Sequence, residues 1–168
     1  MQGNRLEKIV VATGVGRLRQ QQQFDSSIYP EIIEGLETIT GQKPSPRPAR
    51  KSIAAFKLRE GNIVGLKVTL RGKRMRDFFN KVVNVALPRV RDFRGIDPKQ
   101  IDREGNLTIG FRDNTVFPEV SPEDTKRAFG FQVTLVSDAK DWDEAYDFYK
   151  SLGVPLQEKP EKATKKKK

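Results

Sequence analysis

The sequence contains no cysteine and no histidine among its 168 residues. Without cysteine there can be no disulfide framework, no thiolate metal site and no cysteine nucleophile. Without histidine there is no Ser-His-Asp triad and no imidazole base, so catalysis would have to use Asp, Glu, Lys, Arg or Tyr. Gly14 and Gly16 follow a strand-like segment, but neither a complete GxGxxG sequence nor a GK[ST] sequence occurs, so we interpret them as a tight turn. These absences argue against an enzyme, and we expect no cofactor and no metal.

The chain also lacks a long apolar segment. Its mean hydropathy is −0.64, and no apolar run approaches the ~20 residues needed to cross a bilayer. The first residues, MQGNRLEK, contain no apolar core of a secretory signal. We therefore expect a cytoplasmic protein with no membrane partner. A chain of this length favours a single domain, residues 1–158, followed by a disordered basic tail, residues 159–168.

The positive charge is concentrated in one part of the chain. The protein has a net charge of +10, whereas residues 43–94 alone contain 15 basic and 3 acidic side chains, a net charge of +12. Residues 95–158 have a net charge of −6, and the tail adds +5. Such a distribution is typical of a protein that binds a polyanion. Nucleic acid is the favoured ligand; an anionic lipid, a protein partner or no binding role are the alternatives.

Hydrophobic periodicity and turn residues predict an element order β-α-β-β-α-loop-β-β-α. This order indicates an α+β fold, with an antiparallel sheet and helices packed on one side. We expect the other sheet face to be free for a ligand, with the central cations gathered beside it. The predicted strands are 6–12, 53–58, 63–71, 106–112 and 131–136; the predicted helices run from Ile28 to Gly41, from Lys73 to Pro88 and from Trp142 to Leu152.

The cationic part begins with a proline-rich segment, residues 43–50. Its three prolines at alternate positions exclude a helix and a central strand, so we expect an extended arm. The strands 53–58 and 63–71 should then form a hairpin with a basic face. In the second strand Lys67, Thr69 and Arg71 share one side. That side is either an ordinary solvent-exposed face or one that contacts RNA phosphates and riboses.

Two aromatic residues lie among the cations. Phe56 follows Arg50 and Lys51, and we expect it in the hydrophobic core rather than in a base-stacking position, because tight RNA stacking sites usually contain several aromatics. Phe93 lies in a long loop, residues 89–105, with arginines at alternate positions around it. A guanidinium group matches phosphate geometry, so this loop is either an RNA-binding loop or a solvated one.

Several of these segments resemble the family of bacterial large-subunit ribosomal protein number five. The resemblance covers roughly residues 5–155, and its motifs are long and in the family's order. It departs from the family at Ala12, where an asparagine is usual, which moves that contact to Thr13. The matching strings are RLEKIVV, GVG, TGQKP, ARKSIAAFKLREG, VTLRGKRM, ALPRVRDFRG, the Gly-Asn of REGNL, and VFPE.

The resemblance implies a structural, non-enzymatic protein that acts as a monomer within the ribosome. It implies four partners: 5S rRNA, 23S rRNA, P-site tRNA and small-subunit ribosomal protein number thirteen at the intersubunit bridge. The implied 5S rRNA contacts are Thr13, Gln42, Lys43, Arg47, Lys67, Thr69 and Arg71. The implied tRNA-contacting loop contains Arg50, Lys51, Ser52, Ile53, Ala54, Ala55, Phe56, Lys57 and Arg59. The residues implied near 23S rRNA or the bridge are Arg89, Arg91, Phe93 and Arg94.

Two other function classes remain open. A non-ribosomal RNA-binding adaptor with the same fold would bind many RNAs without preferring 5S rRNA. An enzyme acting on a phosphorylated substrate would need a convergent pocket of Asp, Lys and Tyr side chains.

Overall fold

The protein forms a five-stranded antiparallel sheet with helices, described here from a computed structural model for residues 4–121, 123 and 127–159. The strand order is β2-β3-β1-β5-β4, so the first strand in the chain lies at the centre. The α+β class expected from the sequence is confirmed. The strands are β1 (Leu6–Gly14), β2 (Ser45–Pro48), β3 (Ile63–Leu70), β4 (Leu107–Phe111) and β5 (Phe131–Ser137), and the α-helices are α1 (Tyr29–Thr40), α2 (Gly72–Lys81), α3 (Leu87–Arg89) and α4 (Trp142–Ser151).

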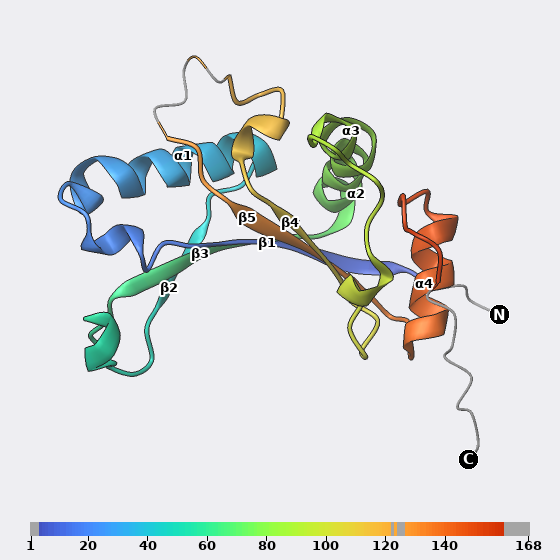
Figure 1. The fold of residues 1–168 in the computed structure, drawn as a ribbon, viewed down its shortest axis with the longest axis horizontal. Coiled ribbons are helices and arrows are strands. Elements are labelled where there is room, and N and C mark those ends of the chain that lie inside the picture. Colours follow the sequence, from blue (N-terminus) through green and yellow to red (C-terminus); the bar gives the residue numbers. More distant parts are fainter. Residues whose placement is uncertain (1–3, 122, 124–126, 160–168) are drawn as a thin grey trace.

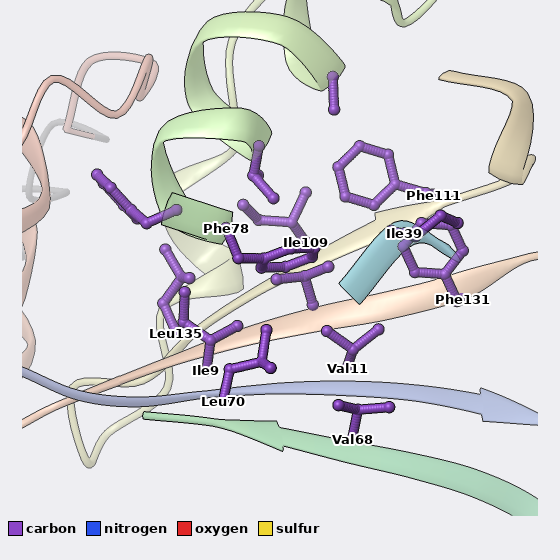
Figure 2. Packing of buried hydrophobic residues seen from close by; sticks show 14 of the residues in the cluster. Ile9, Val11, Ile39, Val68, Leu70, Phe78, Ile109, Phe111, Phe131 and Leu135 are labelled. Atoms are coloured by element: carbon purple, nitrogen blue, oxygen red, sulfur yellow. The ribbon is translucent and has the colours of Figure 1, made fainter. Parts of the chain in front are cut away.

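The helices α1, α2 and α3 cover one face of the sheet, and α4 packs at one end (Figure 1). The strands alternate between buried and partly exposed residues, which places one apolar row of each strand under the helices. Figure 2 shows Ile9 and Val11 of β1 below Phe78 of α2, close to Ile39 of α1. None of the helices in the described part of the chain is long and apolar enough to span a membrane.

The predicted strand 53–58 is wrong. Its residues form a short 3-10 turn, Ala54–Phe56, closed by a single bridge between Ile53 and Leu58. The strand that pairs with β3 is instead β2, inside the proline-rich arm, where Ser45 lies opposite Lys67. β2 is an edge strand, the place in a sheet where proline is tolerated.

The long central helix continues past its expected end at Pro88. Residues Val82–Ala86 form a π-helical turn that joins α2 to α3, and Pro88 lies in the first turn of α3. Proline has no N–H to donate and disfavours a helix interior, and here it lies one residue before the end of the continuous helix. The helix ends at Arg89, where Val90 becomes extended. α1 ends at Gly41, as the sequence predicts, and this glycine adopts a left-handed φ of 68°.

Candidate nucleic-acid interface

The sheet face opposite α1 and α2 is polar, and we call it the open face. Strand register aligns its residues in rows. Val10 of β1 lies opposite Thr69 of β3 and Thr134 of β5, and Thr134 lies opposite Thr108 of β4. In the next row, Ala12 lies opposite Lys67 and Gln132. The open face therefore offers hydroxyl, amide and ammonium groups from β3, β4 and β5, with Val10 and Ala12 of β1 between them.

Lys67 and Thr69 lie on this face as the alternation predicts. Both are partly exposed, while Val68 and Leu70 between and beside them are buried. Within the described residues, neither the Lys67 ammonium nor the Thr69 hydroxyl has a hydrogen-bond partner in the protein, so both groups are available to a ligand. By contrast, the hydroxyl groups of Thr108 and Thr134 form a hydrogen bond with each other, with their oxygens 3.1 Å apart.

Gln42 reaches this part of the sheet from the segment after α1. Its side-chain Nε2 donates a hydrogen bond to the carbonyl oxygen of Thr69 at 3.2 Å. The neighbouring arm exposes Lys43 and Arg47, and Arg47 lies opposite Gly65 of β3. The structure thus brings together five of the seven residues expected to contact 5S rRNA.

Thr13 and Arg71 lie apart from that group. Thr13 is only 6% exposed, and its hydroxyl donates to the carbonyl of Gly130 at 2.6 Å. Arg71 precedes α2 and lines a separate groove together with Arg5 and Met75. Thr13 therefore has little side-chain surface for a ligand, and Arg71 is exposed beside α2 rather than among the open-face residues.

The segment between β2 and β3, residues 49–62, forms a projecting loop that we call the tip loop (Figure 1). Its base is closed by backbone hydrogen bonds between Ala49 and Asn62 at 2.8 Å and between Gly61 and Ala49 at 3.0 Å. The expected burial of Phe56 is wrong: the side chain is 67% exposed, and Ile53 is 43% exposed. All nine residues of the implied tRNA-contacting loop are exposed.

Gln20 contacts the backbone of Phe56 from outside the tip loop. The side-chain Nε2 of Gln20 donates to the Phe56 carbonyl at 3.2 Å. Gln20 belongs to the glutamine run after β1. The sequence did not predict this contact; the run of glutamines was its only unusual feature.

The arginine loop, residues 89–95, lies on the helical side of the sheet, because it begins at α3 (Figure 1). Arg89, Arg91 and Arg94 are exposed, whereas Phe93 packs against the hydrophobic core. The exposed cations that precede and begin α2 also lie away from the open face. The expectation that the central cations gather beside the open face is therefore correct for the arm and Lys67 but wrong for α2 and the arginine loop.

Three polar residues of the open face were not predicted from the sequence. Thr108, Gln132 and Thr134 alternate with buried residues of β4 and β5. The signal was present, because the same polar alternation had identified Lys67 and Thr69. Among the described residues, no group of three Asp or Glu side chains is placed to hold a metal ion.

A polar open face flanked by an exposed cationic arm, on a basic α+β scaffold, is typical of the RNA-binding class of proteins. Comparison with known families makes this specific. Residues 1–59 match the family model described as ribosomal protein L5, and residues 63–156 match the model that describes the C-terminus of the same ribosomal family. The chain belongs to the ribosomal protein L5 family.

The relatives cover nearly the whole chain. The chain is 44% identical over 152 residues to the large ribosomal subunit protein uL5 of Halothermothrix orenii, covering 90% of this chain and 83% of that protein. It is 46% identical over 156 residues to the protein of the same name from Limosilactobacillus fermentum, covering 93% and 84%. For Anaeromyxobacter sp. strain K the identity is 45% over 158 residues, covering 94% and 86%.

Members of this family are structural ribosomal proteins of the large subunit and not enzymes. This family membership confirms the expectation of a non-enzymatic ribosomal protein, located in the bacterial cytoplasm at the ribosome. The individual contact residues stay predictions, as does the boundary between residues 1–158 and the tail. Of the tail, only Lys159 belongs to the described residues, and residues 160–168 lie outside them.

Proposed function

We propose that the protein binds 5S rRNA through the open face and the adjacent arm, and so helps to hold this RNA on the large subunit. The observation that carries the proposal is the clustering of Gln42, Lys67 and Thr69, with the Thr69 hydroxyl and the Lys67 ammonium lacking protein hydrogen-bond partners within the described residues. Folded RNA is recognised largely by shape and by contacts to phosphates and 2′-hydroxyls. Ammonium, hydroxyl and amide groups on a flat sheet suit such contacts.

The cations beside this cluster supply the affinity. Lys43 and Arg47 are exposed along the arm and would neutralise phosphates, while Gln42 and Thr69 would fix the register of the RNA. If about six to eight phosphates are engaged, log affinity should fall with log salt concentration at a slope of roughly −4 to −7. A slope near zero would contradict the proposal.

The other two surfaces have their own proposed partners. The tip loop would contact P-site tRNA, since the loop projects from the sheet (Figure 1) and carries the exposed Phe56 and Ile53 together with four cations. The arginine loop would lie near 23S rRNA and small-subunit ribosomal protein number thirteen. Because these two surfaces lie on different sides of the sheet, one monomer could contact several partners at once.

The proposal is tested by binding and by sedimentation. The full chain should bind 5S rRNA more tightly than a structured RNA of equal length and unrelated sequence, and in cell extract it should sediment with the large subunit. Equal affinity for both RNAs, with no co-sedimentation, would instead indicate a general RNA-binding adaptor and would overturn the ribosomal role.

A further inference from the structure

Two carboxylates and two aromatic rings lie together on one side of α4. The helix begins with Trp142 and Asp143, and the same pair of side-chain types recurs one turn later as Tyr146 and Asp147. Residues four positions apart are neighbours on a helix surface, so the rings form one row and the carboxylates form the next. The ring centroids of Trp142 and Tyr146 are 5.6 Å apart. We call these four residues the α4 site.

Lys159 occupies the α4 site from the segment that follows the helix. Its ammonium nitrogen lies 3.1 Å from a carboxylate oxygen of Asp143 and 3.2 Å from one of Asp147. The same nitrogen lies 4.7 Å from the ring centroid of Tyr146 and 5.8 Å from that of Trp142. Both distances are within the ~6 Å over which a cation is attracted to an aromatic face. One ammonium group therefore contacts all four side chains.

The two rings are held in place by hydrogen bonds of their own. The indole Nε1 of Trp142 donates to the carbonyl of Pro98 at 3.2 Å, and the Tyr146 hydroxyl donates to the carbonyl of Gln157 at 2.9 Å. Such preorganisation lowers the entropic cost of binding. Carboxylates and aromatic faces both attract positive charge. The α4 site is therefore suited to an ammonium ion rather than to an anion or a neutral amide.

The contacts of Lys159 are exposed to solvent, and those of the chain just before it are not of the same kind. The side chains of Asp143 and Asp147 are 56% and 72% exposed. Ion pairs at exposed positions are individually weak, and salt screens them. Gln157, in contrast, is held by its backbone, which donates to the carbonyl of Ile96 at 2.9 Å. Lys159 can therefore leave the α4 site while the chain up to Gln157 stays in place.

We propose that the α4 site binds an ammonium group and that Lys159 is its reversible occupant, anchoring the start of the basic C-terminal segment until a polyanion competes for the lysine. Residues 159–168 contain six lysines and one glutamate, so Lys159 is the first cation of the segment. While its ammonium contacts two carboxylates, it is not available to a phosphate. The inference goes beyond the proposed 5S rRNA binding, because any polyanion would compete.

The test uses the full chain labelled with ¹⁵N, in which Trp142 is the single tryptophan. Lys159→Met removes the ammonium and keeps an unbranched side chain. We expect it to shift the indole N–H signal of Trp142 and to lower the heteronuclear NOE of the amides of residues 158 and 159. Lys150→Met is the matched control: Lys150 also lies near Tyr146, 5.9 Å from its ring centroid, but within the described residues it pairs with no carboxylate. It should leave both signals unchanged.

The emptied site should then accept a free ammonium ion. Butylammonium chloride added to Lys159→Met should return the Trp142 signal toward its position in the unmodified chain, whereas sodium chloride at the same concentration should not. Competition is measured on the unmodified chain with polyuridylate as the probe. As this RNA binds, the Trp142 signal should move toward its position in Lys159→Met.

Three results would overturn the proposal: equal effects of the two lysine variants on the Trp142 signal, a response of Lys159→Met to butylammonium no larger than to sodium, or bound polyuridylate that leaves the Trp142 signal of the unmodified chain in place. The amide spectrum of Lys159→Met shows independently whether the variant is folded. None of these outcomes uses the affinity for 5S rRNA, so failure of this proposal is distinguishable from failure of the proposed function.

Discussion

The side chain of Gln42 completes the hydrogen bonding of β3 at Thr69, where it donates to the backbone carbonyl at 3.2 Å. The edge strand β2 pairs with β3 only as far as Lys67, which lies opposite Ser45. Beyond that point the Gln42 side chain supplies the hydrogen-bond donor that a neighbouring strand would otherwise provide. The hydrogen bond therefore ties the Gln42 side chain to the backbone of Thr69, although the two residues are 27 positions apart.

Replacing Thr69 by valine should weaken 5S rRNA binding without weakening the fold. Valine keeps the shape and the backbone carbonyl that accepts from Gln42, and removes only the hydroxyl. We expect a loss of about 1–3 kcal/mol in binding free energy if that hydroxyl is buried against RNA, measured by filter binding or fluorescence anisotropy. Urea denaturation should give nearly the same free energy of unfolding as for the unmodified chain.

The matched control for that variant is Thr38→Val, which removes an exposed hydroxyl from α1 on the helical side of the sheet. It should leave 5S rRNA affinity unchanged. An unchanged affinity for Thr69→Val would remove Thr69 from the proposed contacts.

Lys81 at the end of α2 links this helix to α1 and to the segment that contains Glu119. Its ammonium donates to the carbonyl of Ile39 at 2.9 Å and lies 2.7 Å from a carboxylate oxygen of Glu119. Partial burial acts to raise the pKa of Glu119, but the hydrogen bond and charge of Lys81, together with a backbone hydrogen bond and the charge of Arg89, outweigh it, so the pKa lies below the usual 4.5. A carboxyl group whose pKa is lowered by folding stabilises the protein above pH ~4.5 and loses that contribution as the pH falls through its folded pKa.

We therefore expect Lys81→Met to lower the free energy of unfolding at neutral pH by up to about 1 kcal/mol, since the pair is partly exposed. The deficit should shrink, but not vanish, as the pH falls below 4.5, because the bond to Ile39 does not titrate there. Urea denaturation at pH 7 and pH 3.5 measures both values, with Lys140→Met as the exposed control. A deficit independent of pH would show that the pair with Glu119 contributes nothing.

Tyr149 is fully buried, and its hydroxyl lies 2.9 Å from the carbonyl of Gly105 and 2.8 Å from that of Leu135. One hydroxyl proton is shared between these two acceptors. Replacing Tyr149 by phenylalanine should lower the free energy of unfolding by about 1 kcal/mol at pH 7, because the Leu135 carbonyl loses its hydroxyl donor. Gly105 keeps a donor, the Ser137 hydroxyl at 2.9 Å.

The same residue predicts a loss of stability in alkali. Burial raises the pKa of Tyr149 to about 12 from its usual 10. Because the folded state favours the protonated form, this stabilisation is complete below pH 10 and is lost between pH 10 and pH 12. Chemical denaturation across that range should show a smaller pH-dependent loss in Tyr149→Phe than in the unmodified chain or in Tyr29→Phe, and identical pH profiles would refute the assignment.

Phe56 should matter for tRNA and not for folding. Its 67% exposed ring contributes little buried surface, so Phe56→Ala should leave the free energy of unfolding within about 0.5 kcal/mol of the original value. If the ring stacks on a tRNA base, ribosomes carrying the variant should bind P-site tRNA more weakly, by about 1–3 kcal/mol. Leu152→Ala, at another exposed apolar residue, is the control and should leave tRNA binding unchanged.

Local patterns in the sequence correctly predicted the helices and strands that have one buried face. The alternation around Lys67 and Thr69 identified both β3 and its open side, and the helical spacing from Met75 to Phe79 identified the buried stripe of α2. Gly41 marked the end of α1 because a left-handed residue there is easiest for glycine.

The errors arose where tertiary pairing overrides local preference. Residues 53–58 have strand-like composition, yet β3 pairs with the arm, and Lys57 at a φ of 50° turns the chain back on itself. The groove between the arginine loop and the segment that follows β4 could not be predicted either. Arg91 and Arg112 are far apart in the chain and converge only because β4 passes beside the arginine loop.

The prolines of β2 affect how this edge of the sheet can pair with other strands. An outer strand normally presents a row of unsatisfied amide groups, which can recruit a strand from another molecule. In Ser45–Pro48 every second residue lacks an amide hydrogen, and the ladder to β3 uses the others. This border of the sheet therefore offers few outward amide hydrogens, which disfavours pairing with a strand of a second copy.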